Sequence, residues 1–167
     1  MKPLAESSGS LAWSPVSSIR RDSVLRDGAD IFGVVHWQSA FKAAALGGTA
    51  SGEWNFVLEG FVFRQWIRVT PTGEKEPCAI FRASPSLNGV LELQGGKSYY
   101  WHSNFWLTKW IWSDEEGTDL LLFDRNLSLI AEGSLEIIPE AIPNPDVPLL
   151  SVLGWYLIVV VSDFRPG

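Results

Sequence analysis

Aromatic, β-branched and polar residues in the middle of the chain form a pattern typical of β-strands. The segment Phe61–Thr70 reads FVFRQWIRVT and runs into the turn residues Pro71-Thr72-Gly73. The segment Phe105–Ser113 reads FWLTKWIWS and precedes an acidic turn closed by Gly117. Such residues favour extended backbone, and Pro and Gly interrupt it, so we expect two strands here. Because side chains alternate along a strand, one face of the first carries Phe61, Phe63, Ile67 and Val69, and the other carries Arg64 and Arg68.

These two segments belong to an internal repeat. At one constant offset Trp66 falls on Trp110, and the segment 89–93 (GVLEL) falls on 133–137 (GSLEI). A weaker third copy begins with the strand-like segment 31–37. Several matches at one offset indicate a repeated supersecondary unit. Antiparallel strands of this kind close into a barrel or a sandwich, because closure removes exposed edges.

The C-terminal segment Leu149–Val161 is apolar except for Ser151 and Gly154. It is too short to span a bilayer comfortably and is flanked by charged residues, so a transmembrane span is not expected. Pro148 suits the first turn of a helix and Asp146 suits its cap, which favours a buried helix over residues 148–164. A buried strand at the β-branched end of the segment, and a membrane anchor, are the alternatives.

A helix that is apolar on every face must be surrounded on every face. A closed barrel provides such surroundings, and its interior needs a filling. We therefore expect one mainly β domain over residues 28–167, with the helix in the middle. Residues 1–27 are rich in Ser and polar groups and are expected to be flexible or peripheral.

The order of these segments resembles the tubby C-terminal-like superfamily, which includes phospholipid scramblases and plant LURP-one-related proteins. The resemblance rests on the acidic turn 114–117, the strand 120–123 (LLLF) and the terminal segment 148–157 (PLLSVLGWYL). It implies a closed antiparallel β-barrel of about twelve strands around a hydrophobic C-terminal helix. Tubby proteins bind phosphoinositides through basic residues on the barrel surface. This chain is acidic and offers no Lys/Arg cluster that could be matched to theirs.

Charge and cysteine content narrow the function classes. The net charge is −6 and the thirteen basic residues are dispersed along the sequence, so the basic stripe of a nucleic-acid-binding protein is missing. Cys78 is the only cysteine, which agrees with a reducing compartment. The N-terminus lacks the apolar run of a signal peptide. Cytoplasmic residence is the prediction.

The sequence predicts no catalytic, cofactor-binding or metal site. His36 and His102 lie far apart without the spacing of metal ligands, and nothing near Cys78 would activate a thiolate. Glu92 and Glu136 occupy equivalent repeat positions and could be read as a glycosidase pair, but strand alternation places each opposite a buried Leu and toward solvent. We expect a protein that is not an enzyme.

The tryptophans provide the one candidate binding face. In a regular strand Trp106, Trp110 and Trp112 lie on one face, and three exposed indoles would form a large patch for a partner. The alternative is that this face is covered or that a bulge turns one ring away. Two functions follow as hypotheses. One is a domain that binds a lipid, a membrane surface or a protein. The other is a carbohydrate-binding module that uses exposed tryptophans.

Overall fold

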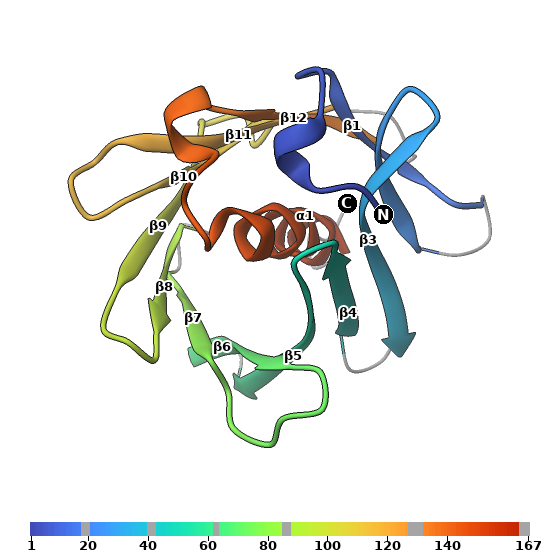
Figure 1. Cartoon of the computed structure of the whole chain (residues 1–167). Helices are drawn as coiled ribbons and strands as arrows, with labels where there is room; N and C mark the ends of the chain where they lie inside the picture. The colour runs from blue at the N-terminus through green and yellow to red at the C-terminus, as the bar shows by residue number, and fades with distance from the viewer. Residues whose placement is uncertain (18–20, 40–42, 62–63, 85–87, 127–131, 164–167) are drawn as a thin grey trace.

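Twelve antiparallel strands close into a barrel around the helix α1 (Figure 1). The structure is a computed structural model that describes residues 1–17, 21–39, 43–61, 64–84, 88–126 and 132–163. The strands are β1 (Leu11–Pro15), β2 (Ser23–Asp27), β3 (Asp30–Ser39), β4 (Ala44–Thr49), β5 (Gly52–Phe61), β6 (Arg64–Pro71), β7 (Ala79–Ala83), β8 (Gly89–Leu93), β9 (Ser98–Ser103), β10 (Lys109–Ser113), β11 (Asp119–Arg125) and β12 (Gly133–Ile137). The short 3-10 helices η1 (Leu4–Glu6) and η2 (Pro139–Ala141) and the helix α1 (Val147–Asp163) complete it.

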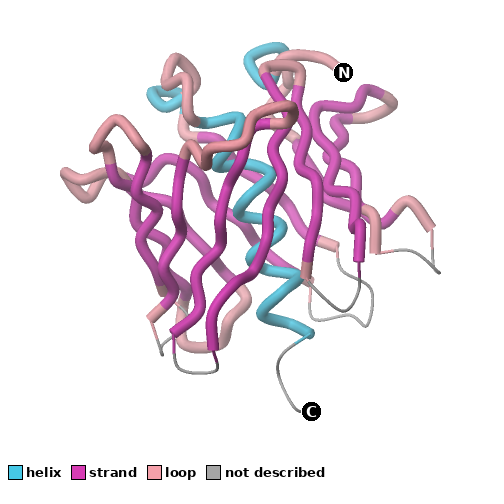
Figure 2. Tube along the Cα trace, turned by 90° about the horizontal axis from the view of Figure 1, so that it is seen from below, coloured by secondary structure: helices cyan, strands magenta, loops and turns pink. Residues whose placement is uncertain are grey.

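Each strand pairs with its neighbours in sequence, and β1 pairs with β12 to close the barrel. Successive connections therefore lie at alternate ends. We call the end that holds the N-terminus, the loops after even-numbered strands and the start of α1 the proximal end. The distal end holds the loops after odd-numbered strands and the last turn of α1. Figure 2 shows α1 running from one end to the other between the strands.

The helix α1 fills the barrel. Every side chain from Leu149 to Val160 is buried. The polar Ser151 is accommodated because its hydroxyl donates to the carbonyl of Val147 at 2.8 Å. The prediction of a central apolar helix is confirmed, with bounds within a residue of those expected, and the alternative of a C-terminal strand is wrong.

The N-terminal boundary predicted from the sequence is wrong. Strands β1 and β2 lie inside the segment 1–27 that was expected to be peripheral, and both belong to the barrel. Trp13 of β1 is buried and stacks on Trp155 of α1. Ser and polar residues dominate this segment on average, but Leu11, Trp13 and Leu25 occupy inward positions and are buried. Alternation decides which strands join a core more than mean polarity does.

The two aromatic strands are shorter than the sequence pattern predicted. Phe61 ends β5 instead of beginning the next strand, and Phe105 lies in the loop before β10. Within β6 the prediction holds, because Ile67 and Val69 face the core while Arg64 and Arg68 are exposed. Phe63, which was expected on the buried face, lies outside the described residues.

The repeat differs between its two copies by one residue of register. Ile67 pairs with the buried Phe81 in the first copy, whereas Trp110 pairs with the buried Phe123 in the second. At the constant offset of the sequence repeat, Trp110 corresponds to Trp66 instead. A shift of one residue moves a side chain to the opposite face of a strand. Trp66 is therefore on the outside of the barrel, and Trp110 is inside.

Candidate functional site

The structure separates the three tryptophans of the predicted binding face. Trp110 is 2% exposed and Trp112 is 0% exposed, and both point into the core against Trp101. Trp106 is 74% exposed and precedes the strand. The hypothesis of one face with three exposed indoles is therefore wrong, and the alternative that this face is covered holds for Trp110 and Trp112. The chain turns between Phe105 and Thr108 and β10 begins only at Lys109, which separates Trp106 from these two core residues.

What remains is a compact aromatic projection at the distal end. Phe105 is 87% exposed, and its ring lies edge-on to that of Trp106, with centroids 5.2 Å apart and an interplanar angle of 87°. We call these two residues the aromatic tip. Exposure of two adjacent large rings is unfavourable in water, since each would gain about 1.5–3 kcal/mol from full burial.

The loop that carries the aromatic tip is built around Asn104. The Asn104 Oδ1 accepts hydrogen bonds from the backbone N–H groups of Thr108 at 2.9 Å and Lys109 at 3.1 Å. Its Nδ2 donates to the Thr108 hydroxyl at 2.8 Å. The Asn104 backbone N–H donates to the Lys109 carbonyl at 3.0 Å, which closes the loop. The side chain thus replaces the ladder hydrogen bonds that these residues would make in a longer hairpin.

Leu107, which follows the aromatic tip, holds the loop against the barrel. Its φ is 56°, a left-handed value that is uncommon for a residue with a Cβ and a branched side chain. This backbone turn lets the Leu107 side chain pack against the core while Phe105 and Trp106 point outward. Non-glycine residues in this region cluster at functional sites, where surrounding contacts maintain the strain.

Two further apolar side chains are exposed at the distal end. Phe61, at the end of β5, is 87% exposed, and Val16, just after β1, is 59% exposed. Phe61 ends an odd-numbered strand and Val16 follows one, so both lie at the same end of the barrel as the aromatic tip. Sequence reasoning missed them because it assigned Phe61 to a buried strand face and Val16 to a peripheral segment. The Ser-Asn pair before Phe105 is a turn signal that could have separated the aromatic tip from β10.

Each histidine lies next to a polar side chain of the barrel wall. His36 Nδ1 lies 2.8 Å from the carboxylate of Asp22, which also accepts from the backbone N–H of Trp37. His102 Nε2 lies 3.4 Å from the Ser113 hydroxyl. That hydroxyl donates its proton to Asp119 at 2.9 Å, so His102 cannot take the proton as a general base in this geometry. Both histidines act as hydrogen-bonding groups of the barrel wall.

Cys78, Glu92 and Glu136 lie on or next to different strands of the barrel wall. Burial raises the pKa of the Cys78 thiol, which disfavours the nucleophilic thiolate. Cys78 and Glu92 line a shallow pocket of about 310 Å³ between β7 and β8. Glu92 and Glu136 are both exposed on separate strands, as alternation predicted.

A second pocket, of about 380 Å³, lies at the proximal end. Leu4 of η1, Ile142 and Pro148 are among its apolar lining residues. Across the described ranges, no group of His, Cys, Asp and Glu has the proximity needed to hold a metal ion. Among those same residues, no helix combines the length and apolar character that crossing a bilayer requires.

Comparisons with models of protein families, with curated proteins and with solved structures gave no match to the chain. The structure bears out the barrel and the central helix. Membership of the tubby C-terminal-like superfamily stays a prediction.

Proposed function

We propose that the protein binds the surface of a membrane through the distal end of its barrel, and that the aromatic tip inserts into the interfacial region. The observation that supports this most directly is the exposure of Phe105 and Trp106 on a loop held by Asn104. Aromatic side chains favour the membrane interface, where a large ring leaves water while polar groups nearby stay hydrated. Phe61 and Val16 add exposed apolar side chains at two other positions around the same end.

The fold suits this function because the tip is presented by a rigid support. Strand β10 begins at Lys109, shortly after the aromatic tip, and its Trp110 stacks on Trp101 with centroids 5.3 Å apart. The backbone N–H of Arg125 on β11 donates to the Thr108 carbonyl at 2.8 Å, which ties the loop to a second strand. A preorganised loop loses little conformational entropy on binding, so more of the apolar transfer free energy appears as affinity.

The structure gives less support to the carbohydrate-binding alternative. A sugar-binding platform needs flat, open ring faces in a row, and Trp110 and Trp112 are buried. Trp106 has Phe105 edge-on beside it instead of a coplanar neighbour. Binding of a polysaccharide is therefore an outcome of the test below and not a second proposal.

Flotation with large unilamellar vesicles tests the proposal. The double variant Phe105→Ala/Trp106→Ala removes two exposed rings and leaves the core intact. Loss of their insertion should cost about 3 kcal/mol, which is about a hundredfold in the partition coefficient onto vesicles that contain phosphatidylcholine and phosphatidylglycerol in equal parts. Ile142→Ala is the matched control, because Ile142 is an exposed apolar residue at the proximal end.

The wild-type chain should float with the vesicles, the tip variant should stay largely in solution, and the Ile142→Ala control should resemble the wild type. Equal flotation of the tip variant and the wild type would overturn the proposal. If the wild-type protein bound an insoluble polysaccharide in a way that depends on Trp106, and did not bind vesicles, the proposal would be overturned in favour of the carbohydrate alternative.

A further inference from the structure

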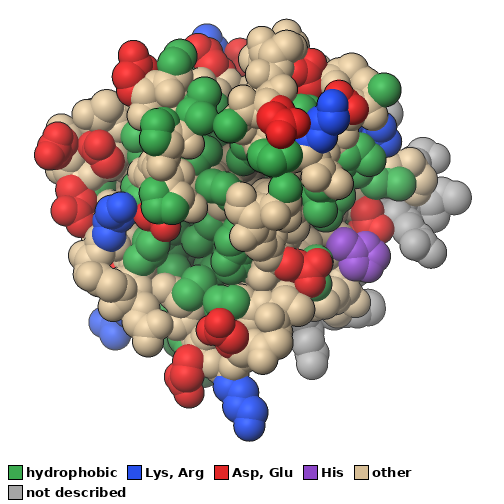
Figure 3. Space-filling view, viewed as in Figure 1, with side chains coloured by type: hydrophobic (Ala, Val, Ile, Leu, Met, Phe, Trp, Pro, Cys, Tyr) green, Lys and Arg blue, Asp and Glu red, His purple; other side chains and the backbone are tan. Residues whose placement is uncertain are grey.

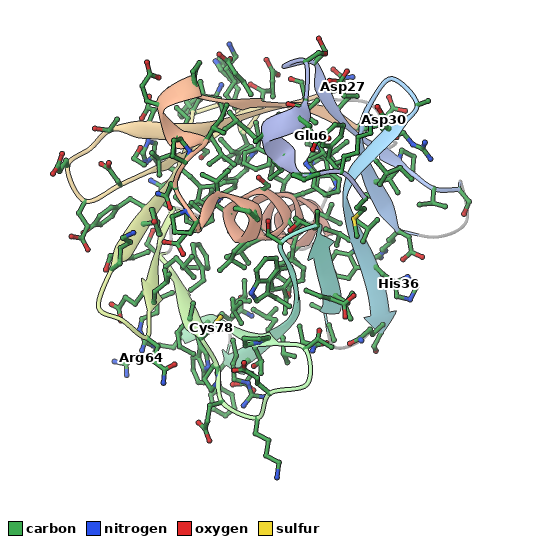
Figure 4. The ribbon with its side chains drawn as sticks, in the orientation of Figure 1. Glu6, Asp27, Asp30, His36, Arg64 and Cys78 are labelled. Carbon is green, nitrogen blue, oxygen red and sulfur yellow. The ribbon has the colours of Figure 1, made fainter. Side chains whose placement is uncertain are left out.

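The two ends of the barrel differ in charge, although the basic residues are dispersed along the sequence. Because connections alternate between the ends, side chains that are dispersed along the sequence gather in space. The proximal loops and their flanking strand ends carry the acidic residues Asp27, Asp30, Glu53, Glu74, Glu76, Asp114, Glu115, Glu116, Asp119, Glu140 and Asp146. Figure 3 looks onto this end and shows Asp and Glu side chains distributed over it, with fewer Lys and Arg. Figure 4 labels Glu6, Asp27 and Asp30 there.

The distal end carries exposed arginines instead. Arg64 begins β6 and Arg82 lies near the end of β7, and both side chains are exposed. Neither forms an ion pair with a carboxylate of the described residues. Arg68, further along β6, is already paired with Glu59 at 2.7 Å. Arg64 and Arg82 thus present guanidinium groups with uncompensated charge at this end.

Strand register places the two arginines near each other, and Arg64 beside the exposed Phe61. Arg82 is the cross-strand partner of Trp66, and Arg64 precedes Trp66 by two positions on the same outer face. Arg64 is also the cross-strand partner of Phe61. Arg64 and Arg82 are thus diagonal neighbours on adjacent strands. Such neighbours lie roughly 7–8 Å apart, so two long side chains can converge on one anion. The two arginines and the exposed Phe61 therefore occupy one corner of the distal end.

The acidic groups at the distal end leave this corner positive. Asp22 is engaged by His36, and Glu59 by Arg68 and by the indole N–H of Trp66. Asp124 faces Lys109 across β10 and β11, and Glu132 directly precedes β12, so both lie on another side of the barrel.

We infer that the distal end selects anionic membranes, with Arg64 and Arg82 binding phospholipid phosphates while the acidic proximal end is directed away from the bilayer. This inference rests on the proposed function and specifies its partner. Guanidinium groups pair with phosphate through two parallel hydrogen bonds, and each basic side chain near an anionic bilayer contributes about 1 kcal/mol. A chain of net charge −6 with evenly spread charge would be repelled by such a bilayer, whereas a polarised one is oriented by it.

The test compares two double variants of equal charge on two kinds of vesicle. Arg64→Gln/Arg82→Gln removes two positive charges at the distal end. Arg26→Gln/Lys75→Gln removes two from exposed positions at the proximal end and is the matched control. The vesicles are pure phosphatidylcholine or an equal mixture with phosphatidylglycerol, and partition is measured by flotation at low and at raised sodium chloride.

The wild type should prefer the mixed vesicles, and raised salt should weaken this preference. The Arg64→Gln/Arg82→Gln variant should bind mixed vesicles about thirtyfold more weakly and pure phosphatidylcholine as the wild type does. The proximal control should retain the wild-type preference.

Equal binding of the wild type to both kinds of vesicle would overturn the inference and leave the proposed function standing. An equal loss in the two double variants would also overturn it, because net charge and not its position would then decide. Absence of binding to either kind of vesicle would remove the proposed function itself.

Discussion

The indole rings of Trp13 and Trp155 stack in parallel, with centroids 5.4 Å apart and an interplanar angle of 3°. Trp13 comes from β1, which closes the barrel against β12, and Trp155 comes from the middle of α1. The contact therefore joins the first strand of the chain to its last element, the central helix.

Trp13→Ala should destabilise the fold strongly. Truncation of a buried tryptophan leaves a cavity and typically costs about 3–5 kcal/mol. The expected result is a lower free energy of unfolding in urea, measured by circular dichroism. Trp106→Ala is the control, because Trp106 is exposed and its removal should change the free energy by no more than about 0.5 kcal/mol. Similar losses in the two variants would contradict the placement of β1 in the core.

Apolar pattern predicted the central helix well. A segment apolar on every face has few folded environments available, and Pro148 limited where the helix could begin. The helix begins at Val147, and the Asp146 carbonyl accepts from the Leu150 N–H as expected of a cap residue. The Asp146 side chain does not cap the helix. It accepts from the Tyr99 phenol at 2.6 Å, a tertiary contact that local sequence cannot show.

The distal end was harder to predict because its parts are far apart in sequence. Arg64 and Arg82 become neighbours only through the register of β6 on β7. Phe105 and Trp106 looked like the start of a strand, since aromatic residues favour strands, and the hydrogen bonds of Asn104 overrode that preference. The register shift of one residue between the two repeat copies also places Trp110 inside the barrel, whereas its repeat equivalent Trp66 is outside.

Gly154→Ala should destabilise the barrel although alanine is the better helix former. A Cβ at this position would lie 2.5 Å from Phe123 Cζ and 2.9 Å from Trp112 Nε1, so the helix or the barrel wall must move. Overpacking of this kind typically costs about 1–3 kcal/mol. Ser151→Ala is the control on the same buried helix, because it removes only one hydrogen bond to the Val147 carbonyl. A thermal melt in which Gly154→Ala is as stable as the wild type would contradict this close approach.

Stability should fall at alkaline pH because of two tyrosines. Burial raises the pKa of Tyr156, and burial together with the hydrogen bond to Asp146 raises the pKa of Tyr99. Both phenols stay protonated in the fold at a pH where the unfolded chain, with a tyrosine pKa near 10, has lost those protons. The folded state is then stabilised fully below about pH 10, and the stabilisation is lost as the pH rises toward the folded pKa values, at about 1.4 kcal/mol per pH unit for each group.

Denaturant unfolding at a series of alkaline pH values checks this linkage. Tyr156→Phe should be less stable near neutral pH, since it loses the hydrogen bond to the Ala43 carbonyl, but its stability should fall less steeply above pH 10. Tyr99→Phe should show the same smaller slope. Slopes identical to that of the wild type in both variants would show that these phenols do not govern the alkaline transition.

Asn104→Ala should weaken membrane binding without touching either ring of the aromatic tip. The variant loses the acceptor for the Thr108 and Lys109 N–H groups, so these amides should exchange with solvent faster. A disordered tip must be ordered at the membrane, and we expect partition onto mixed vesicles to fall about tenfold, the equivalent of about 1.4 kcal/mol. Asn104→Asp keeps the acceptor oxygen and should retain most of the amide protection. Fast exchange combined with unchanged partition in Asn104→Ala would show that rigidity of the loop does not contribute to binding.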